Sequence, residues 1–128
     1  MTYIGIDVSK DSFVAAYPTK SGYTTKTFPN TTSGVRKFIN SLPADCHCVM
    51  EATGNYSMLL LYLLQQANII VSMENPQKIK HFARAMLSTT KTDEIDAKLI
   101  AMYGEKMEPA PYKIPSESII LLLSLIHI

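Results

Sequence analysis

The chain has 128 residues, a length that suits one domain able to bury about two-thirds of the surface that its unfolded chain would expose. Its composition, 47% hydrophobic and 18% charged with 5 glycines and 7 prolines, excludes a disordered or collagen-like chain. The formal net charge of +1 lacks the basic excess typical of nucleic-acid-binding domains, so any such contact must come from local patches.

The first third of the sequence predicts a β-meander and then a helix. Alternating apolar residues predict a first strand in which Asp7 lies on the face opposite Ile4 and Ile6. Two further runs rich in β-branched and aromatic residues flank a turn-forming stretch, which is typical of antiparallel strands. Polar capping residues then precede apolar residues at helical spacing. The expected elements are strands over 3–8, 12–17 and 23–28, and a helix that follows 30–33 and ends before Pro43.

The rest of the sequence alternates short β-branched runs with helices. One run stops at Glu51, which predicts a strand that ends on a carboxylate. Pro76 is well placed as the first residue of a later helix, and Gly104 is expected to end the last one. Strands that alternate with helices after a meander predict an α/β fold with a mixed sheet. The expected elements are strands over 47–51 and 68–73 and helices over 59–66, 77–86 and 93–103.

The segment Cys46-His47-Cys48 raises the question of a zinc site. A structural zinc site needs four ligands, and no second pair with suitable spacing follows, so alternating strand residues are the favoured interpretation. The cysteines give no disulfide framework, which fits a reducing, cytoplasmic setting. The N-terminus lacks the features of a signal peptide, and the longest apolar run, 119–126, is too short to span a bilayer. No membrane association is expected.

Four carboxylates occur where the predicted elements could bring them together. Asp7 lies on the first strand, Glu51 ends another, and Asp93 and Asp96 have the i, i+3 spacing that places them on one helix face. Gathered carboxylates repel one another unless a cation neutralises them, and Mg²⁺ accepts ligands that are all oxygen. The sequence therefore predicts a Mg²⁺ site, with Mn²⁺ as a substitute.

Each of these acids also has an ordinary structural interpretation. Asp7 could face solvent from an edge strand, and Glu51 could be an acid in the first turn of a helix. Asp93 and Asp96 could stabilise the start of a helix capped by Thr90 or Thr92. A basic segment precedes them and is, equally, a candidate for nucleic-acid contact or a solvated helix face. Its charged residues are Lys78, Lys80, Arg84 and Lys91.

Four sequence motifs carry a resemblance to a known family. They are GIDVSK at 5–10, MEATGNY at 50–56, NPQK at 75–78 and KTDEIDA at 91–97. In order and spacing they resemble the RuvC-like transposases of the DEDD type, which include the pilin-gene-inverting recombinases. The resemblance covers residues 1 to about 112 and implies a ribonuclease H-like fold. It implies a DNA transposase that cleaves and transfers strands in the transposition of an insertion sequence.

The same resemblance makes the four acids, Asp7, Glu51, Asp93 and Asp96, both the catalytic residues and the Mg²⁺ ligands. It makes Lys10 a further candidate for contact with phosphates, besides the basic segment. DNA is the expected partner, and a structured guide RNA and a homo-oligomer are implied for the full-length enzyme. The setting is expected to be prokaryotic and nucleoid-associated.

The expected organisation is a catalytic domain over 1–112, followed by a linker and the start of a truncated helical region over 113–128. Relatives continue into a second domain that supplies a nucleophilic serine, so this chain is expected to be inactive alone.

Three alternatives to a recombinase stay open. The chain could be a truncated, non-catalytic fragment that binds nucleic acid, or a junction-resolving nuclease that needs only the four acids. A sugar-kinase-like phosphotransferase shares the GIDVS strand, but its nucleotide site needs glycine-rich loops downstream. No glycine follows Gly104.

Overall fold

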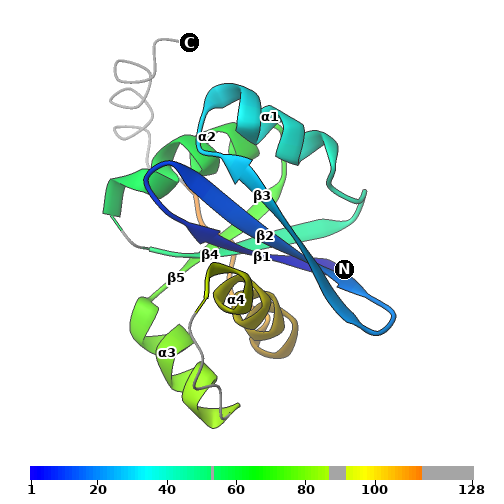
Figure 1. Ribbon diagram of the computed structural model, residues 1–128, viewed down its shortest axis with the longest axis vertical. Coiled ribbons are helices and arrows are strands. Elements are labelled where there is room, and N and C mark those ends of the chain that lie inside the picture. The colour runs from blue at the N-terminus through cyan, green and yellow to red at the C-terminus, as the bar shows by residue number, and fades with distance from the viewer. Residues whose placement is uncertain (53, 87–91, 114–128) are drawn as a thin grey trace.

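The computed structural model describes residues 1–52, 54–86 and 92–113, which form a mixed sheet with helices on both faces (Figure 1). The strands are β1 (Thr2–Val8), β2 (Ser12–Thr19), β3 (Gly22–Pro29), β4 (Cys46–Glu51) and β5 (Ile70–Glu74). Their order in the sheet is β3-β2-β1-β4-β5. The predicted meander of β1, β2 and β3 is antiparallel, while β4 and β5 run parallel to β1. The carboxyl ends of β1, β4 and β5 therefore meet at one edge of the sheet.

Two helices, α1 (Thr32–Asn40) and α2 (Met58–Gln66), cover one face of the sheet (Figure 1). The predicted capping is confirmed, since Thr31 Oγ1 accepts the Gly34 N–H at 3.1 Å. A 3₁₀ turn, η1 (Gly54–Ser57), leads into α2. Large apolar side chains fill the space between these helices and the sheet. Fully buried members of this core are Ile4, Ile6, Phe13, Phe38, Met50, Leu60, Leu61 and Leu64.

On the other face, α4 (Asp93–Met107) lies against β1 and β2, and α3 (Pro76–Ala85) lies beside α4 (Figure 1). The contact with β1 is made by small residues. A Cβ added at Gly5 would collide with the carbonyl oxygen of Ala97 and the amide nitrogen of Ala101. Glycine is required here because the helix backbone lies directly on the strand. This close approach fixes the position of the first half of α4 above β1.

Helix α4 is longer than predicted, so the expectation that Gly104 ends it is wrong. The helix continues to Met107, and Glu108 with φ 45° ends it in the left-handed conformation. Gly104 is needed for packing instead, because an added Cβ would lie 2.8 Å from carbon atoms of both Tyr3 and Val49. A glycine that permits close packing and one that ends a helix look alike in sequence.

The segment 109–112, here called the strap, wraps around the outer edge of β5. The Ser72 hydroxyl donates to the Ala110 carbonyl at 2.8 Å on the α4 face of the sheet. The Tyr112 N–H donates to the Val71 carbonyl at 2.7 Å, and its own carbonyl accepts from Gln65 Nε2 of α2 at 2.7 Å. The strap therefore passes from one face of the sheet to the other.

The predicted boundary at residues 112 and 113 stays a prediction, because 114–128 lie outside the described residues. Among the helices of the described ranges, none is long and apolar enough to cross a bilayer.

Candidate metal centre

Asp7 and Glu51 come from the carboxyl ends of neighbouring parallel strands. The register pairs Ile6 with Met50, and the two acids occupy the next position on each strand. Side chains alternate along a strand, so Asp7 shares the face of Gly5 and points towards α4. The alternative of an edge-strand aspartate is wrong, because β1 is the central strand of the sheet.

Asp93 and Asp96 lie in the first turn of α4. Thr92 caps this helix, its Oγ1 accepting the Ile95 N–H at 3.1 Å, which confirms the predicted cap and leaves the acid side chains of this turn available for a site. Ala97 follows Asp96 directly and contacts Gly5, which lies two residues before Asp7. The small-residue contact therefore brings the first turn of α4 over the carboxyl end of β1.

Asp7, Glu51, Asp93 and Asp96 form one electrostatically linked group, here called the acid cluster. Burial is the largest cause of a rise in the pKa of Asp7 from its ordinary 3.8 to about 7. The other causes, in decreasing order, are the charge of Asp96, the charge of Asp93, a hydrogen bond with Asp93 and the charge of Glu51. Near neutral pH, the Asp7 carboxyl is therefore protonated in a substantial fraction of the molecules.

The acid cluster is not arranged as a finished coordination sphere. Within residues 1–52, 54–86 and 92–113, no three His, Cys, Asp or Glu side chains stand so that they could hold a metal ion. The donor set nevertheless fits a hard divalent cation, since all four groups are carboxylates. Holding a metal would require the carboxylates to turn towards a common point and Asp7 to lose its proton.

The predicted basic residues separate into two groups on α3. Lys80 lines a cavity of about 200 Å³ between α3 and α4, together with Glu51 and Asp96. Arg84, one turn further on, is exposed. Lys78 faces away from this cavity and pairs with Glu74 at 3.6 Å. Of the predicted basic residues on α3, Lys80 is therefore the one that lies beside the acids.

The other two predicted basic residues lie outside α3. Lys10 is exposed in the loop that follows β1. Lys91 lies outside the described residues.

Glu74 is a carboxylate at the same edge of the sheet that the sequence analysis missed. It ends β5 and pairs in register with Glu51. Burial raises its pKa, but the Asn75 N–H at 2.9 Å, the Tyr103 hydroxyl at 2.9 Å and Lys78 outweigh burial and leave the pKa lowered. Glu74, like Glu51, directly follows a short apolar run in the sequence, and this pattern predicts a carboxylate at the end of a strand.

The Cys46-His47-Cys48 segment forms the predicted strand, and its side chains alternate. Cys46 and Cys48 are free thiols buried in the core under α1 and α2, while His47 lies on the opposite face. These three side chains cannot share a zinc ion. Burial lowers the pKa of His47, and its Nε2 lies 2.6 Å from the Ser72 hydroxyl. Since that hydroxyl donates to the strap, His47 acts as the donor here.

Comparison with known proteins places this fold and these motifs in a family. The model of a transposase family, the DEDD transposases of the IS110 type, matches residues 4–127. The pilin gene-inverting proteins of Moraxella lacunata and Moraxella bovis are 34% and 33% identical to the chain. Each match covers 98% of this chain and 41% of the relative. The chain thus spans about two-fifths of the length of these curated relatives.

Two solved structures of RuvC from Thermus thermophilus share the fold. The complex with a Holliday junction substrate gives a TM-score of 0.58 at 11% identity, covering 88% of this chain and 99% of RuvC. A second RuvC structure gives 0.58 at 12% identity, with 88% and 100% covered. This likeness confirms the predicted RuvC-like, ribonuclease H-like sheet. Because the family model matches nearly its whole length, the chain belongs to the DEDD transposases of the IS110 type.

Proposed function

We propose that this chain is the catalytic domain of a DNA transposase or recombinase, in which the acid cluster holds Mg²⁺ for DNA strand cleavage and transfer. The observation that carries the proposal is the convergence of carboxylates from β1, β4 and α4 at one edge of the sheet. Burial first, and then repulsion from the neighbouring carboxylates, raises the pKa of Asp7 to about 7, and a divalent cation would relieve the repulsion. Membership of a transposase family supports DNA as the substrate.

The roles of the chain's own residues follow from their positions. When bound, a pair of Mg²⁺ ions supplies stabilisation of the attacking and leaving oxygens in phosphoryl transfer. Asp7, whose pKa is raised to about 7, must lose its proton to act as a ligand. Glu51 and Asp96 line the cavity beside Lys80. The Lys80 ammonium would hold a DNA phosphate against the repulsion of the acids.

A calorimetric Mn²⁺ titration tests the metal site directly. We expect the parent chain to bind Mn²⁺ with proton release, and the Asp7→Asn, Asp96→Asn double variant to lose binding by at least about tenfold. The matched control is Asp45→Asn, which removes an exposed acid that precedes β4 and therefore lies at the opposite edge of the sheet. Equal binding by the double variant and the control would remove the acid cluster from the metal site.

A junction-resolving nuclease is the second candidate, because the fold is that of RuvC, one structure of which holds a Holliday junction substrate. Product analysis on a labelled four-way junction separates the candidates. Symmetric nicks that need Mn²⁺ and Asp7, without exchange of strands, would favour the nuclease. Rejoined, exchanged strands from the full-length protein would favour the recombinase. Specific binding of the junction without any cleavage, by this chain and by the full-length protein, would favour a non-catalytic fragment.

Three further expectations stay predictions. They are the use of a structured guide RNA, assembly as a homo-oligomer, and inactivity of this chain by itself.

A further inference from the structure

The Asn30 side chain joins the loop after β1 to the turn after β4. Its Nδ2 donates to the Ser9 carbonyl at 3.0 Å and to the Tyr56 carbonyl at 2.9 Å, and lies 3.5 Å from the Lys10 carbonyl. Carbonyls need donors, so the NH₂ end of the amide must face them. Within the described ranges, Asn30 Oδ1 is buried without a hydrogen-bond partner, so the amide is held by its nitrogen alone. The two loops are therefore fastened to each other at this point.

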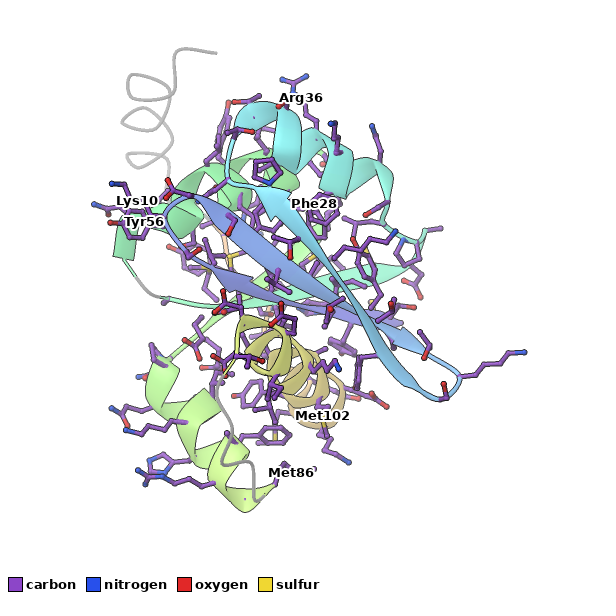
Figure 2. All side chains as sticks on the ribbon, in the orientation of Figure 1. Lys10, Phe28, Arg36, Tyr56, Met86 and Met102 are labelled. Atoms are coloured by element: carbon purple, nitrogen blue, oxygen red, sulfur yellow. The ribbon has the colours of Figure 1, made fainter. Side chains whose placement is uncertain are left out.

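This connection presents an aromatic ring and a cation side by side. Tyr56 is 52% exposed although it lies in the ordered turn η1, and the Lys10 side chain is exposed. Figure 2 shows both side chains projecting from the same end of the molecule. Their backbone carbonyls both lie against the Asn30 amide, so the two residues are anchored close together. We call the pair the Tyr56–Lys10 patch.

The Tyr56–Lys10 patch lies at the edge of the sheet that carries the acid cluster. Lys10 follows Asp7 by three positions, and Tyr56 follows Glu51 by five. Ligands of open α/β sheets bind outside the carboxyl ends of the strands, where these loops lie. The patch consists of one exposed aromatic ring and one exposed cation. Neither residue belongs to the apolar core beneath α2.

The chemistry of the pair selects its ligand. An exposed tyrosine ring offers a flat face on which an unpaired base can stack, and an adjacent ammonium binds the phosphate of the same strand. A base inside a duplex has no free face to offer, so the ligand is single-stranded. The nearby carboxylates repel phosphates, and the Lys10 ammonium would reduce this repulsion for a strand that approaches them.

We propose that the Tyr56–Lys10 patch binds an unpaired nucleotide of the substrate DNA next to the acid cluster. Tyr56 stacks on the base, Lys10 binds a phosphate, and Asn30 holds the two loops at the spacing this requires. The inference rests on the proposed function, because it takes DNA as the substrate.

The absence of tryptophan from the chain allows a direct test of stacking. In Tyr56→Trp the new indole is the sole tryptophan, and a single-stranded oligothymidine should quench its emission while a blunt duplex should not. Tyr56→Ala should weaken binding of the oligothymidine by roughly tenfold, and Tyr56→Phe should retain it, because stacking needs the ring and not the hydroxyl. The aromatic control is Tyr112→Ala, which removes an exposed ring near the amino end of β5.

Salt dependence tests Lys10 separately from the ring. Lys10→Gln should reduce the slope of log affinity against log salt by about 0.7, the loss of one phosphate contact on a single strand. Lys20→Gln is the matched control, because Lys20 is exposed in the turn between β2 and β3 at the opposite edge of the sheet.

The outcomes separate this inference from the proposed function. Unchanged oligothymidine binding in Tyr56→Ala, no quenching in Tyr56→Trp, or no binding by the parent chain would each overturn the inference. Tighter binding of an RNA oligomer of matching length would overturn the assignment to DNA. The Mn²⁺ titration reports on the acid cluster in all of these cases, so the metal site stands or fails by itself. Urea midpoints equal to that of the parent show that the variants are folded.

Discussion

The two faces of the sheet bury different kinds of side chain. Under α1 and α2, aromatic rings and long aliphatic chains interlock, with Phe38 edge-on to Phe13 and Phe28 at ring separations of 5.3 and 5.4 Å. Under α4, the contact with β1 rests on Gly5, Ala97 and other small residues. Polar groups are buried on the α4 face as well. They include His47, Ser72 and the hydroxyl of Tyr103, and Asp7 on the same face is half-buried.

The two faces of the sheet therefore contribute differently to the stability of the fold and to the acid cluster. Apolar burial scales with area, so the α1 and α2 face supplies most of the hydrophobic stabilisation. At the Gly5 contact, the α4 face lacks large side chains, so the helix can approach closely enough to bring its first-turn acids to the carboxyl end of β1. Large side chains such as Ile100 and Tyr103 are buried further along this face. Repulsion within the acid cluster then costs stability while no metal is bound.

Phe38→Ala should have the largest effect on stability. Phe38 is fully buried between two other rings, so its removal should lower the free energy of unfolding by about 3–5 kcal/mol. Urea denaturation measures this change, with Arg36→Ala on the exposed side of α1 as a control expected to stay within about 0.5 kcal/mol (Figure 2). The Mn²⁺ affinity of the folded variant should not change, and a large loss would show that the two faces are coupled.

Gly5→Ala should have an intermediate effect on stability and a large one on the site. The added methyl group collides with helix backbone and not with a flexible side chain, so about 1–3 kcal/mol or more should be lost. Displacement of α4 also moves Asp93 and Asp96 away from Asp7. Mn²⁺ affinity should therefore fall in Gly5→Ala but not in Phe38→Ala. Parent-like metal binding by Gly5→Ala would contradict the role given to this contact.

Asp7→Asn should stabilise the metal-free chain. Of the three substitutions, it should change the free energy of unfolding least, and its effect should depend most on pH. The folded pKa of about 7 lies above the unfolded 3.8, so the folded state holds the proton more tightly, and Asp7 costs stability as pH rises through this window. Because solvent screens this half-buried group, we expect a gain of only about 1–2 kcal/mol near pH 7.5, fading towards about pH 4.

Urea denaturation in the presence of a chelator, near both pH values, measures the Asp7→Asn effect. The exposed Asp45→Asn variant should show no comparable gain. Equal stability of Asp7→Asn and the parent near pH 7.5 would mean that the acid cluster is not under electrostatic strain.

The sequence predicted the parts of this molecule that depend on local pattern. Alternation placed Asp7 on the face opposite Ile4, a strand end placed Glu51 at the sheet edge, and i, i+3 spacing put two aspartates in one helix turn. The four ligand roles came from the family resemblance, and the metal-binding role itself stays a prediction.

The features that were missed depend on contacts between distant segments. Asn30 reaches Tyr56 across 26 residues, and Ser72 reaches Ala110 across 38. No periodicity encodes such pairs, and an asparagine before a helix reads as a cap whether or not its side chain is used elsewhere. The error at Gly104 has the same origin, because the atoms that require a glycine there belong to Tyr3 and Val49.

The strap makes the two outer edges of the sheet unequal. Unpaired edge strands invite pairing with other chains. At β5, the Tyr112 N–H already occupies an outward-facing carbonyl, so an approaching strand would first have to displace the strap. At the other edge, β3 carries exposed Lys26 and ends at Pro29, two features that discourage pairing without preventing it. Within the described part of the chain, any strand-mediated self-association or aggregation should therefore begin at β3.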